Sequence, residues 1–271
     1  MQITFIKPAG AWASIDLREI FAYRELLYFL TWRDLKIRYK QAAIGIAWAL
    51  LQPVLTTAIF TIIFSTFARF ETKDVPYPLF ALSGLMIWLY IHSTVTMASN
   101  SFTGNTNLVT KVYFPRLIVP IAAAAAGLVD LIFSIAILVV MMLYFRIGIT
   151  ANILFALLFI VFALILTTAV GTFFSALNVK YRDVKFALPF LLQVWMIASP
   201  IFYPASLLGE KWKLVFAINP LVGILEGFRV SIFGGMFDWT VITISGVSLS
   251  MIVIISLAVF KKMEADFADL I

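Results

Sequence analysis

Six apolar segments, each close to the length that crosses a lipid bilayer, constrain the fold of this chain more than any other feature. They cover approximately residues 43–67, 79–100, 117–144, 151–177, 186–203 and 239–260. About 20 helical residues cross the hydrocarbon core of a bilayer. Apolar residues make up 63% of the 271 residues, whereas a soluble domain has about 45–50%. We therefore predict an all-α polytopic membrane protein with six transmembrane helices, in which residues 1–271 form a single transmembrane domain.

The stretch between the last two predicted spans, residues 204–237, contains two apolar pieces that are too short to span. They cover about 206–217 and 221–233, and Asn219-Pro220 separates them. A helix of ~12 residues is ~18 Å long at 1.5 Å per residue, against ~30 Å of hydrocarbon. We predict a pair of short re-entrant helices, whose backbone must be buried in protein or line a wet cavity. The alternative is that the whole stretch is one spanning hairpin.

The distribution of positive charge predicts the orientation. Of the 20 Lys and Arg residues, 14 fall on the side that holds both termini. Cytoplasmic loops carry the excess of basic residues in membrane proteins, so we predict cytoplasmic N- and C-termini. The net charge of +6 then reflects topology, and a nucleic-acid partner is not expected. The segments assigned to the cytoplasm are 1–42, 101–116, 178–185 and 261–271.

The N-terminal segment, residues 1–42, leads to a basic collar. Residues 1–31 mix aromatic, apolar and charged side chains, and we expect no cleavable signal there. We expect an interfacial helix, since Trp and Tyr prefer the headgroup region; the alternative is a partly ordered cytoplasmic tail. The collar opens the stretch WRDLKIRYKQAAIGIAWALLQP (32–53), and its cations are Arg33, Lys36, Arg38 and Lys40.

The chain lacks the residue patterns of the common catalytic and metal sites. It has no cysteine, no HExxH and no GxxxxGK[ST], so we expect no metal, no catalytic residues and no cofactor in this chain. The single histidine, His92, is expected to be a hydrogen-bonded packing residue in the second span. Because the chain has no phosphate-binding loop but has short basic inner loops, we predict a permease driven by a separate protein that docks from the cytoplasm.

Asp130 is the one ionisable residue that lies well inside a regular predicted span. A charge at the centre of a membrane helix costs about 2.5–3.5 kcal/mol on insertion scales, so Asp130 needs a partner or contact with water. It bonds a hydroxyl or amide of a neighbouring helix, or it lies on a transport pathway. One isolated acid is a poor basis for a proton relay, which disfavours ion-coupled transport.

Aromatic residues and one charged pair are further candidates for function. The aromatic residues of the spans either pack or stack against sugar rings, and those of interest are Trp48, Phe60, Trp88, Tyr90, Trp195, Phe202 and Tyr203. Glu226 and Arg229 share a face of the second short helix, since residues three apart are neighbours on a helix. They form a self-neutralising pair or the polar rim of an outer gate, near Asn219.

Three stretches, in chain order, resemble motifs of the ABC polysaccharide-export permeases. They are WRDLKIRYKQAAIGIAWALLQP (32–53), NVKYRDV (178–184) and NPLVGILEGFR (219–229), and the resemblance covers essentially the whole chain. This family, within the type-2 ABC exporters, holds the transmembrane subunits of O-antigen, capsule and teichoic-acid exporters. The resemblance implies a permease homodimer in the bacterial inner membrane, with two copies of a separate subunit that binds Mg-ATP. The implied substrate is a glycan linked to the membrane lipid undecaprenyl diphosphate.

The resemblance also implies roles for individual residues. The main coupling helix maps to residues 107–116 and a second coupling loop to 180–185, with the candidates Asn107, Leu108, Lys111, Tyr113, Arg116, Lys180, Arg182 and Asp183. The collar cations would meet the lipid diphosphate at the membrane edge, where cations bind phosphates; alternatively they only set topology or bind anionic lipid. The two short helices, with Asn219, Glu226 and Arg229, would form an outer gate, and the aromatic set would line the pathway.

Two other functions are compatible with parts of the pattern. A type-2 ABC exporter of drugs or lipids shares the six-span plan but is not expected to keep the motif at 32–53 so fully. A membrane glycosyltransferase would need paired carboxylates or a metal set at the membrane face. The acidic residues Asp16, Glu19, Asp34 and Asp183 form no such spaced motif.

Overall fold

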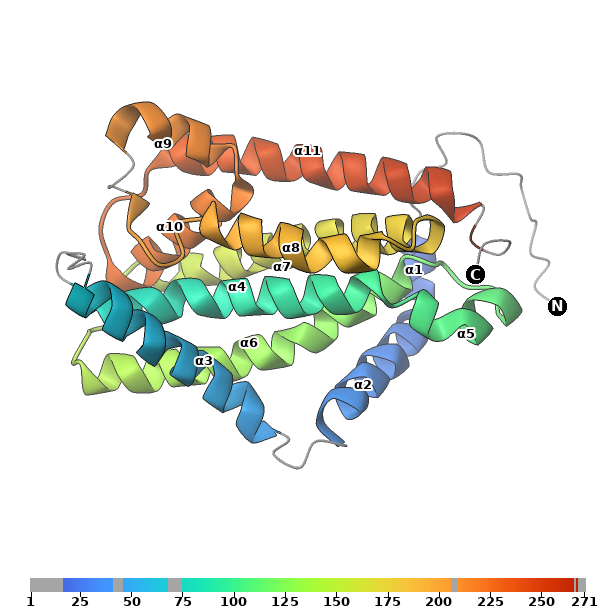
Figure 1. The fold of residues 1–271 in the computed structure, drawn as a ribbon, viewed down its shortest axis with the longest axis horizontal. Coiled ribbons are helices and arrows are strands. Elements are labelled where there is room, and N and C mark those ends of the chain that lie inside the picture. Colours follow the sequence, from blue (N-terminus) through green and yellow to red (C-terminus); the bar gives the residue numbers. More distant parts are fainter. Residues whose placement is uncertain (1–16, 41–45, 68–74, 206–208, 266, 268–271) are drawn as a thin grey trace.

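The computed structural model describes residues 17–40, 46–67, 75–205, 209–265 and 267, and its regular elements are all helices. The main body is a bundle whose long helices run along one axis (Figure 1). Its members are α4 (Tyr77–Ser99), α6 (Ile118–Tyr144), α7 (Ile153–Lys180), α8 (Val184–Ile197) and α11 (Trp239–Glu264). The all-α prediction is confirmed for this part of the chain.

Five helices of the described residues are long and apolar enough to cross a membrane, by length and composition. They are α3 (Ile46–Thr61, continued by a π-helical turn Ile62–Phe67), α4, α6, α7 and α11. The predicted span at 186–203 differs, because α8 has only 14 residues, or ~21 Å. The α8 helix ends at Ile197, shortly before Ser199-Pro200, since a residue before proline disfavours the α conformation.

The helix α4 is the centre of the bundle, and α3 lies at its edge. In the most apolar 18-residue stretch of α4, 78% of the stretch is buried inside the protein, whereas in the corresponding stretch of α3 and its π-helical turn the share is 11%. Small residues let neighbouring helices approach α4 closely, as is common in membrane bundles. A Cβ atom added at Gly171 of α7 would lie 2.8 Å from the Cβ of Ala98 in α4. Packing on several sides therefore fixes the position of α4, whereas α3 is in contact with the bundle on few sides.

Two short helices, α9 (Gly209–Ala217) and α10 (Pro220–Phe233), match the two apolar pieces expected between the last spans. The side chain of Asn219 caps α10, because its oxygen accepts a hydrogen bond from the backbone N–H of Leu221 at 3.1 Å. Both helices lie at one end of the bundle, on the left in Figure 1, beside the start of α11. Residues 206–208 of the first piece lie outside the described residues, and the re-entrant path stays a prediction.

The opposite end of the bundle, which we call the α5 end, gathers α1 (Leu17–Ala22), the start of α2 (Arg24–Lys40), α5 (Thr106–Lys111) and the last turns of α11 (Figure 1). A second buried cluster joins them, and it includes Leu30, Phe102, Phe114 and Phe260. Val179 of the segment 178–185 and Phe267 of the segment 261–271 belong to the same cluster. Described parts of the four segments that the charge count assigned to the cytoplasm therefore lie together. The side of the membrane that this end faces stays a prediction.

Two inner segments differ from their expected bounds. The basic loop expected at 178–185 is mostly helical, since α7 continues to Lys180 and α8 begins at Val184. The coupling helix expected within 107–116 ends at Lys111, and Val112 is already extended. Pro115 is consistent with this end, because a proline has no N–H for a helical bond to the carbonyl four residues earlier, that of Lys111.

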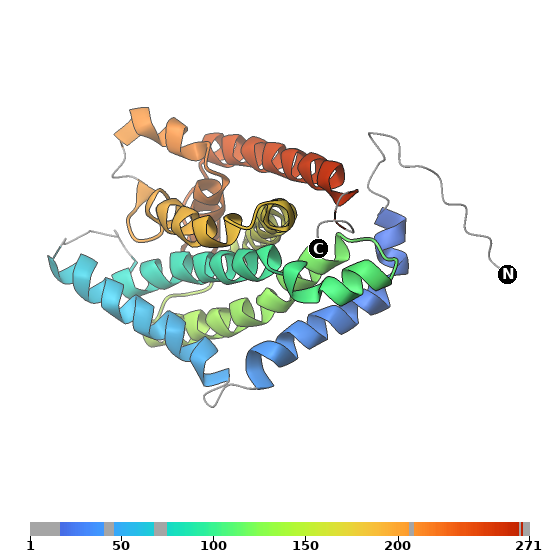
Figure 2. The ribbon, with the colours of Figure 1, turned by 45° about the vertical axis from the view of Figure 1, so that its right-hand side comes forward.

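The helix α2 packs against α6 instead of lying apart from the bundle. Leu30 is buried, and the Tyr39 ring meets the Phe133 ring of α6 edge-on, with centroids 6.5 Å apart. The helices α2 and α3 are inclined to each other like the arms of a V (Figures 1 and 2). Consequently the end of the basic collar lies alongside the middle of α6, deeper in the bundle than a collar at the membrane edge.

Candidate functional site

A cavity of about 500 Å³ lies between the V of α2 and α3 on one side and α4 and α6 on the other. Its lining combines charged, polar and apolar side chains from all four helices: Arg38, Tyr39, Trp48, Ala49, Gln52, Pro53, Met86, Leu89, Tyr90, His92, Ser93, Asp130 and Ser134. Ligand sites in proteins are mostly apolar hollows with a few convergent polar groups. This cavity is therefore the candidate functional site.

Asp130 joins α6 to the end of α2 in this cavity. Its two carboxylate oxygens accept hydrogen bonds from the Arg38 guanidinium and from the Tyr39 hydroxyl. The side chains of Arg38 and Asp130 are 21% and 24% exposed, so the pair is half-buried and borders the cavity. Mutual neutralisation explains how a charge can lie in the middle of a membrane helix. The need for a partner was predicted, but a guanidinium on α2 was not.

The rest of the wall divides into a polar and an apolar part. Gln52 and His92 are exposed, and the Ser134 hydroxyl donates to the Asp130 carbonyl at 3.0 Å. Trp48 is 54% exposed, and Met86 and Leu89 belong to the same wall. His92 was expected as a packing residue within the second span; it is instead exposed at the cavity wall.

The other collar cations lie in three different surroundings. The Arg33 guanidinium donates to the Asn105 side-chain oxygen at 2.7 Å and to Asp34 at 2.8 Å. Lys36 is exposed, with its ammonium 5.5 Å from the Trp32 ring centroid, and Lys40 is exposed at the end of α2. The collar thus divides: Arg33 holds the segment before α5, Arg38 borders the cavity, and the two lysines face outward.

The predicted coupling segment combines an exposed surface with firm anchors. Lys111 is exposed and Tyr113 is 79% exposed. The Tyr113 hydroxyl contacts Glu19 of α1 at 3.4 Å, and the negative charge of Glu19 raises the pKa of Tyr113. Leu108 packs on the cluster at the α5 end, and the Arg116 guanidinium bonds the Glu264 carbonyl at the end of α11.

The remaining coupling candidates lie at the same end or outside the described side chains. Lys180, Arg182 and Asp183 are exposed around the short α7–α8 connection, and the Lys180 ammonium lies 5.8 Å from the Tyr181 ring centroid. Asn107 belongs to α5, but its side chain is outside the described part of the structure. The coupling role of all of these residues stays a prediction.

Arg229 of the predicted outer gate is buried, at 5% exposure. Its guanidinium donates to the carbonyls of Pro200 at 2.7 Å and Ile201 at 2.8 Å. It lies 3.7 Å from the Phe80 ring centroid, whereas the nearest Glu226 oxygen is 3.4 Å away. Arg229 therefore fastens α10 to α4 and to the turn after α8, and its role in an outer gate stays a prediction.

Asn219 and Trp195 form a second fastening at the same end. The Trp195 indole N–H donates to the Asn219 side-chain oxygen at 3.0 Å, and the Asn219 amide donates to Ser199 at 2.8 Å. Trp195 also meets Trp88 edge-on, with centroids 5.8 Å apart. Because Trp88 is 2% exposed, it is a packing residue of the core in this arrangement.

The other aromatic candidates are either packing residues or residues of the cavity wall. Phe60 and Phe202 stack with centroids 3.7 Å apart, which joins α3 to the turn after α8, and Phe202 is buried. The Tyr203 hydroxyl donates to the Ile197 carbonyl at 3.2 Å. Trp48 and Tyr90 belong to the cavity wall, and of these two only Trp48 is exposed.

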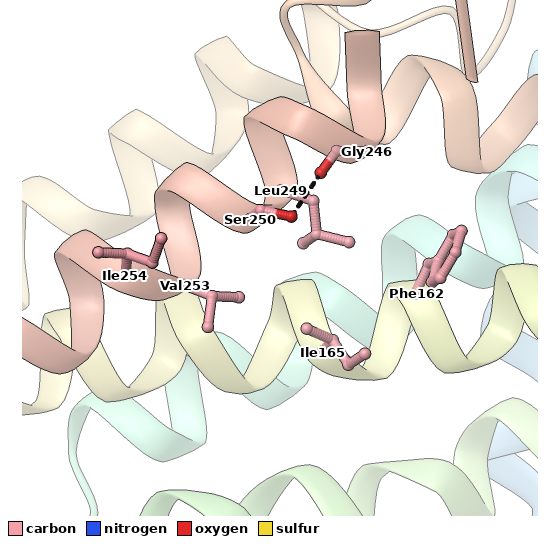
Figure 3. A pocket seen from close by; sticks show the side chains of 7 residues that line it. All are labelled: Phe162, Ile165, Gly246, Leu249, Ser250, Val253 and Ile254. Atoms are coloured by element: carbon pink, nitrogen blue, oxygen red, sulfur yellow. Dashed lines mark hydrogen bonds between the residues drawn. The ribbon is translucent and has the colours of Figure 1, made fainter. Parts of the chain in front are cut away.

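A second hollow, of about 400 Å³, lies between α7 and α11 (Figure 3). Its seven lining residues are Phe162, Ile165, Gly246, Leu249, Ser250, Val253 and Ile254. The Ser250 hydroxyl is turned back onto the Gly246 carbonyl at 2.9 Å, as Figure 3 shows. This groove therefore offers an apolar surface with few polar groups, and it has none of the charges of the cavity at Arg38.

Sequence reasoning found Arg38 and Asp130 separately but not their contact. It missed Tyr39 and Gln52, and it did not place His92 on a cavity wall. The available signal was the mid-span carboxylate, which demands a partner. Arg38 and Asp130 are 92 residues apart in the sequence, so no local pattern could select the partner.

Comparisons with known proteins give consistent likenesses over most of the chain. A family profile described as "ABC-2 type transporter" matches residues 25–233. The O-antigen export system permease protein RfbA of Klebsiella pneumoniae is 25% identical over 248 residues, which cover 91% of this chain and 95% of that protein. The protein of the same name from Myxococcus xanthus is 27% identical, covering 79% and 82%. The polysialic acid transport protein KpsM of Escherichia coli is 25% identical, covering 83% and 85%.

Proposed function

Since this chain belongs to the ABC-2 type transporter family, we propose that it is the permease subunit of an ATP-driven exporter that moves a lipid-linked polysaccharide across the bacterial inner membrane. The observation that carries the proposal is the near full-length likeness to proteins named as O-antigen export permeases. The five span-length helices agree with a multi-pass membrane location. Polysaccharide as the cargo comes from the relatives' names and from the three motifs.

An ATP-binding partner would dock at the α5 end. Lys111 and Tyr113 are exposed there, and Lys180 and Arg182 are exposed at the α7–α8 connection. The segment is anchored to α2 through Arg33 and Asn105 and to α11 through Arg116 and Glu264. A push on α5 would therefore reach both helices. The proposed assembly is a homodimer of this chain with two such subunits, which hold Mg-ATP, and with both termini of the chain in the cytoplasm.

The lipid diphosphate of the substrate would be met by the collar of Arg33, Lys36, Arg38 and Lys40. Charge-assisted hydrogen bonds from arginine to phosphate are stronger than neutral ones, and basic residues at a membrane surface attract anionic headgroups. Arg38 also belongs to the wall of the cavity between α2, α3, α4 and α6. The family membership and the basic collar together favour export of a lipid-linked glycan over the alternative of a membrane glycosyltransferase.

The function is tested by deleting the gene from its native bacterium and measuring surface polysaccharide and intracellular lipid-linked glycan. Loss of the surface polymer with accumulation of the lipid-linked glycan inside the cell is expected. A second test measures ATP hydrolysis by the purified permease with its ATP-binding partner, with and without that glycan. Turnover that responds to small amphiphiles and not to the glycan would favour a drug or lipid exporter.

The coupling role is tested with Lys111→Glu, which reverses an exposed charge on α5. We expect export to fall by about tenfold or more, since like charges placed at a docking surface cost several kcal/mol, while membrane insertion stays normal. Polysaccharide at the cell surface and the amount of permease in the membrane are measured together. Arg116 is a poorer choice, because its bond to the Glu264 carbonyl makes a structural effect expected. Normal export by Lys111→Glu would reject the coupling assignment.

A further inference from the structure

Arg38 is the collar cation whose surroundings resemble a binding site. Lys36 and Lys40 are exposed, and Arg33 is bound to Asp34 and to Asn105 before α5. Arg38 is 21% exposed and belongs to the wall of the cavity between α2, α3, α4 and α6. A charged group in a partly enclosed hollow has less water to compete for its hydrogen bonds than a group on an open surface.

The donors at this point match a tetrahedral anion. The Arg38 guanidinium and the Tyr39 hydroxyl converge on the Asp130 carboxylate from one side. A second guanidinium nitrogen of Arg38 lies 3.5 Å from the Met97 sulfur, which is a weak acceptor. Phosphate oxygens accept hydrogen bonds from the same groups and bind arginine through two donors at once. A phosphate could therefore take the Tyr39 donor and more than one Arg38 donor.

The cavity also has room and chemistry for more than the anion. Gln52, His92 and Ser93 add polar groups to the same lining, while Trp48, Met86 and Leu89 supply apolar surface. A phosphate ester that carries a hydrocarbon chain has the same two parts. The arrangement favours such a lipid over a free phosphate ion, which would leave the apolar wall without contacts.

We propose that this cavity binds the phosphate group of a membrane lipid through Arg38 and Tyr39, and that Asp130 is an internal competitor that holds these two donors until the phosphate displaces it. The inference rests on the proposed function, because the lipid phosphate of the exported glycan is the ligand it would serve. Asp130 keeps Arg38 neutralised until the phosphate arrives. The displaced carboxylate, 24% exposed, would then rely on contact with water in the cavity, and its release frees the end of α2 from α6. Binding of the headgroup would thereby loosen one arm of the V that borders the cavity.

The alternative is that Asp130 and Arg38 only fasten two helices. The two readings differ in the effect of removing the carboxylate charge. A competitor that is neutralised makes Arg38 and Tyr39 more available, so phosphate binds more tightly. A purely structural partner that is neutralised lets Arg38 lose its position, so any phosphate binding weakens.

The test measures lipid binding by the purified full-length chain in a phosphate-free maltoside detergent, by native mass spectrometry. The probes are undecaprenyl phosphate, a diacyl phosphatidic acid and phosphatidylcholine. The variants are Arg38→Gln, Asp130→Asn and Tyr39→Phe, and the matched control is Lys262→Gln, which removes one exposed positive charge at the end of α11. Tyr39→Phe keeps both charges of the pair and so remains informative if another variant fails to fold.

The expected result is binding of a lipid phosphate that Arg38→Gln weakens about tenfold or more and that Asp130→Asn strengthens by a similar factor. Tyr39→Phe, which removes one hydroxyl donor to a charged phosphate, should weaken it about tenfold or more, and Lys262→Gln should leave it unchanged. Equal dependence on Arg38 for the prenyl and diacyl lipids would assign the site to the shared phosphate. Dependence confined to undecaprenyl phosphate would assign it to the prenyl lipid. Binding that is the same in Arg38→Gln, or that falls in Asp130→Asn, would overturn the proposal.

Failure of this site and failure of the proposed function give different results. Polysaccharide export is measured in cells for the same variants. Export that depends on the permease, together with lipid binding that ignores Arg38, would reject the site and keep the function. Lipid binding that depends on Arg38, in a bacterium whose surface polysaccharide survives deletion of the gene, would keep the site and reject the function.

Discussion

Two half-buried or buried arginines at opposite parts of the molecule are held in very different ways. Arg229 is surrounded by fixed acceptors, namely the carbonyls of Pro200 and Ile201, and by the Phe80 ring. Arg38 is held mainly by one carboxylate, that of Asp130, at the wall of a cavity. Backbone carbonyls cannot leave without unfolding the turn that carries them, whereas a carboxylate can rotate away.

This difference in acceptors explains how an arginine can have a structural role at position 229 and be available to a ligand at position 38. The guanidinium of Arg229 fills the hydrogen-bonding needs of buried carbonyls, which would otherwise be costly. Gly84 makes room for it, because a Cβ atom there would lie 2.7 Å from an Arg229 nitrogen. Among the residues that the structure describes, no comparable packing surrounds the exposed side of Arg38, which belongs to the cavity wall.

The largest effect is expected from Arg229→Leu. It leaves the carbonyls of Pro200 and Ile201 without their donor, and each such buried group costs about 1–3 kcal/mol. We expect a loss of roughly 3–5 kcal/mol in stability, as when one partner of a buried polar set is removed. The measurement is the thermal unfolding of the detergent-solubilised protein. Arg146→Gln, which removes an exposed arginine from the α6–α7 loop, is the control, and equal unfolding of both variants would contradict the fastening role.

A smaller effect is expected at the cavity, from a double-mutant cycle with Arg38→Leu and Asp130→Leu. Each single change should destabilise by about 1.5–3 kcal/mol, the range for hydrogen bonds to charged groups. The double change should be nearly neutral, since replacing both partners of an ion pair by apolar residues removes the unpaired charge. Stability is measured as for Arg229→Leu. Additive losses in the double variant would show that the two residues do not act as a pair.

The smallest effect is expected from Asp238→Asn at the start of α11. Lys213 donates a hydrogen bond to the Asp238 carboxylate at 2.5 Å and holds its pKa below the ordinary value of 3.8. A lowered folded pKa adds stability above pH 3.8, and this stability is lost as the pH falls through the folded pKa. Asparagine keeps the helix cap, so only the charge is removed, at about 0.2–1 kcal/mol for a partly exposed pair at the surface.

The pH dependence provides the check on this last substitution. The unfolding temperatures of the wild type and of Asp238→Asn should differ at neutral pH and converge in acid, below the pKa of the folded carboxyl group. A difference that persists unchanged in strong acid would mean that the charge of Asp238 is not the source of the effect. We expect the loss of stability on removing this ion pair to be smaller than the loss at either arginine site.

The sequence by itself determined the class of the fold, five spans, the two short helices and the family. Hydropathy and proline positions are local properties, so apolar segments of sufficient length identify membrane helices without knowledge of their neighbours. The helix at 184–197 was the exception, because its length depends on the turn before Pro200 and not on hydropathy alone.

Only the tertiary structure decided which polar residues are partners. Arg38 donates a hydrogen bond to Asp130, 92 residues away in the sequence, and Arg229 donates one to Ser83, 146 residues away. Each polar group within a membrane must satisfy its hydrogen bonds inside the protein, and the helix packing alone decides which groups come within reach. For this reason the cations of the collar can be identified from the sequence, whereas only the fold shows that Arg38 lies in the wall of the cavity.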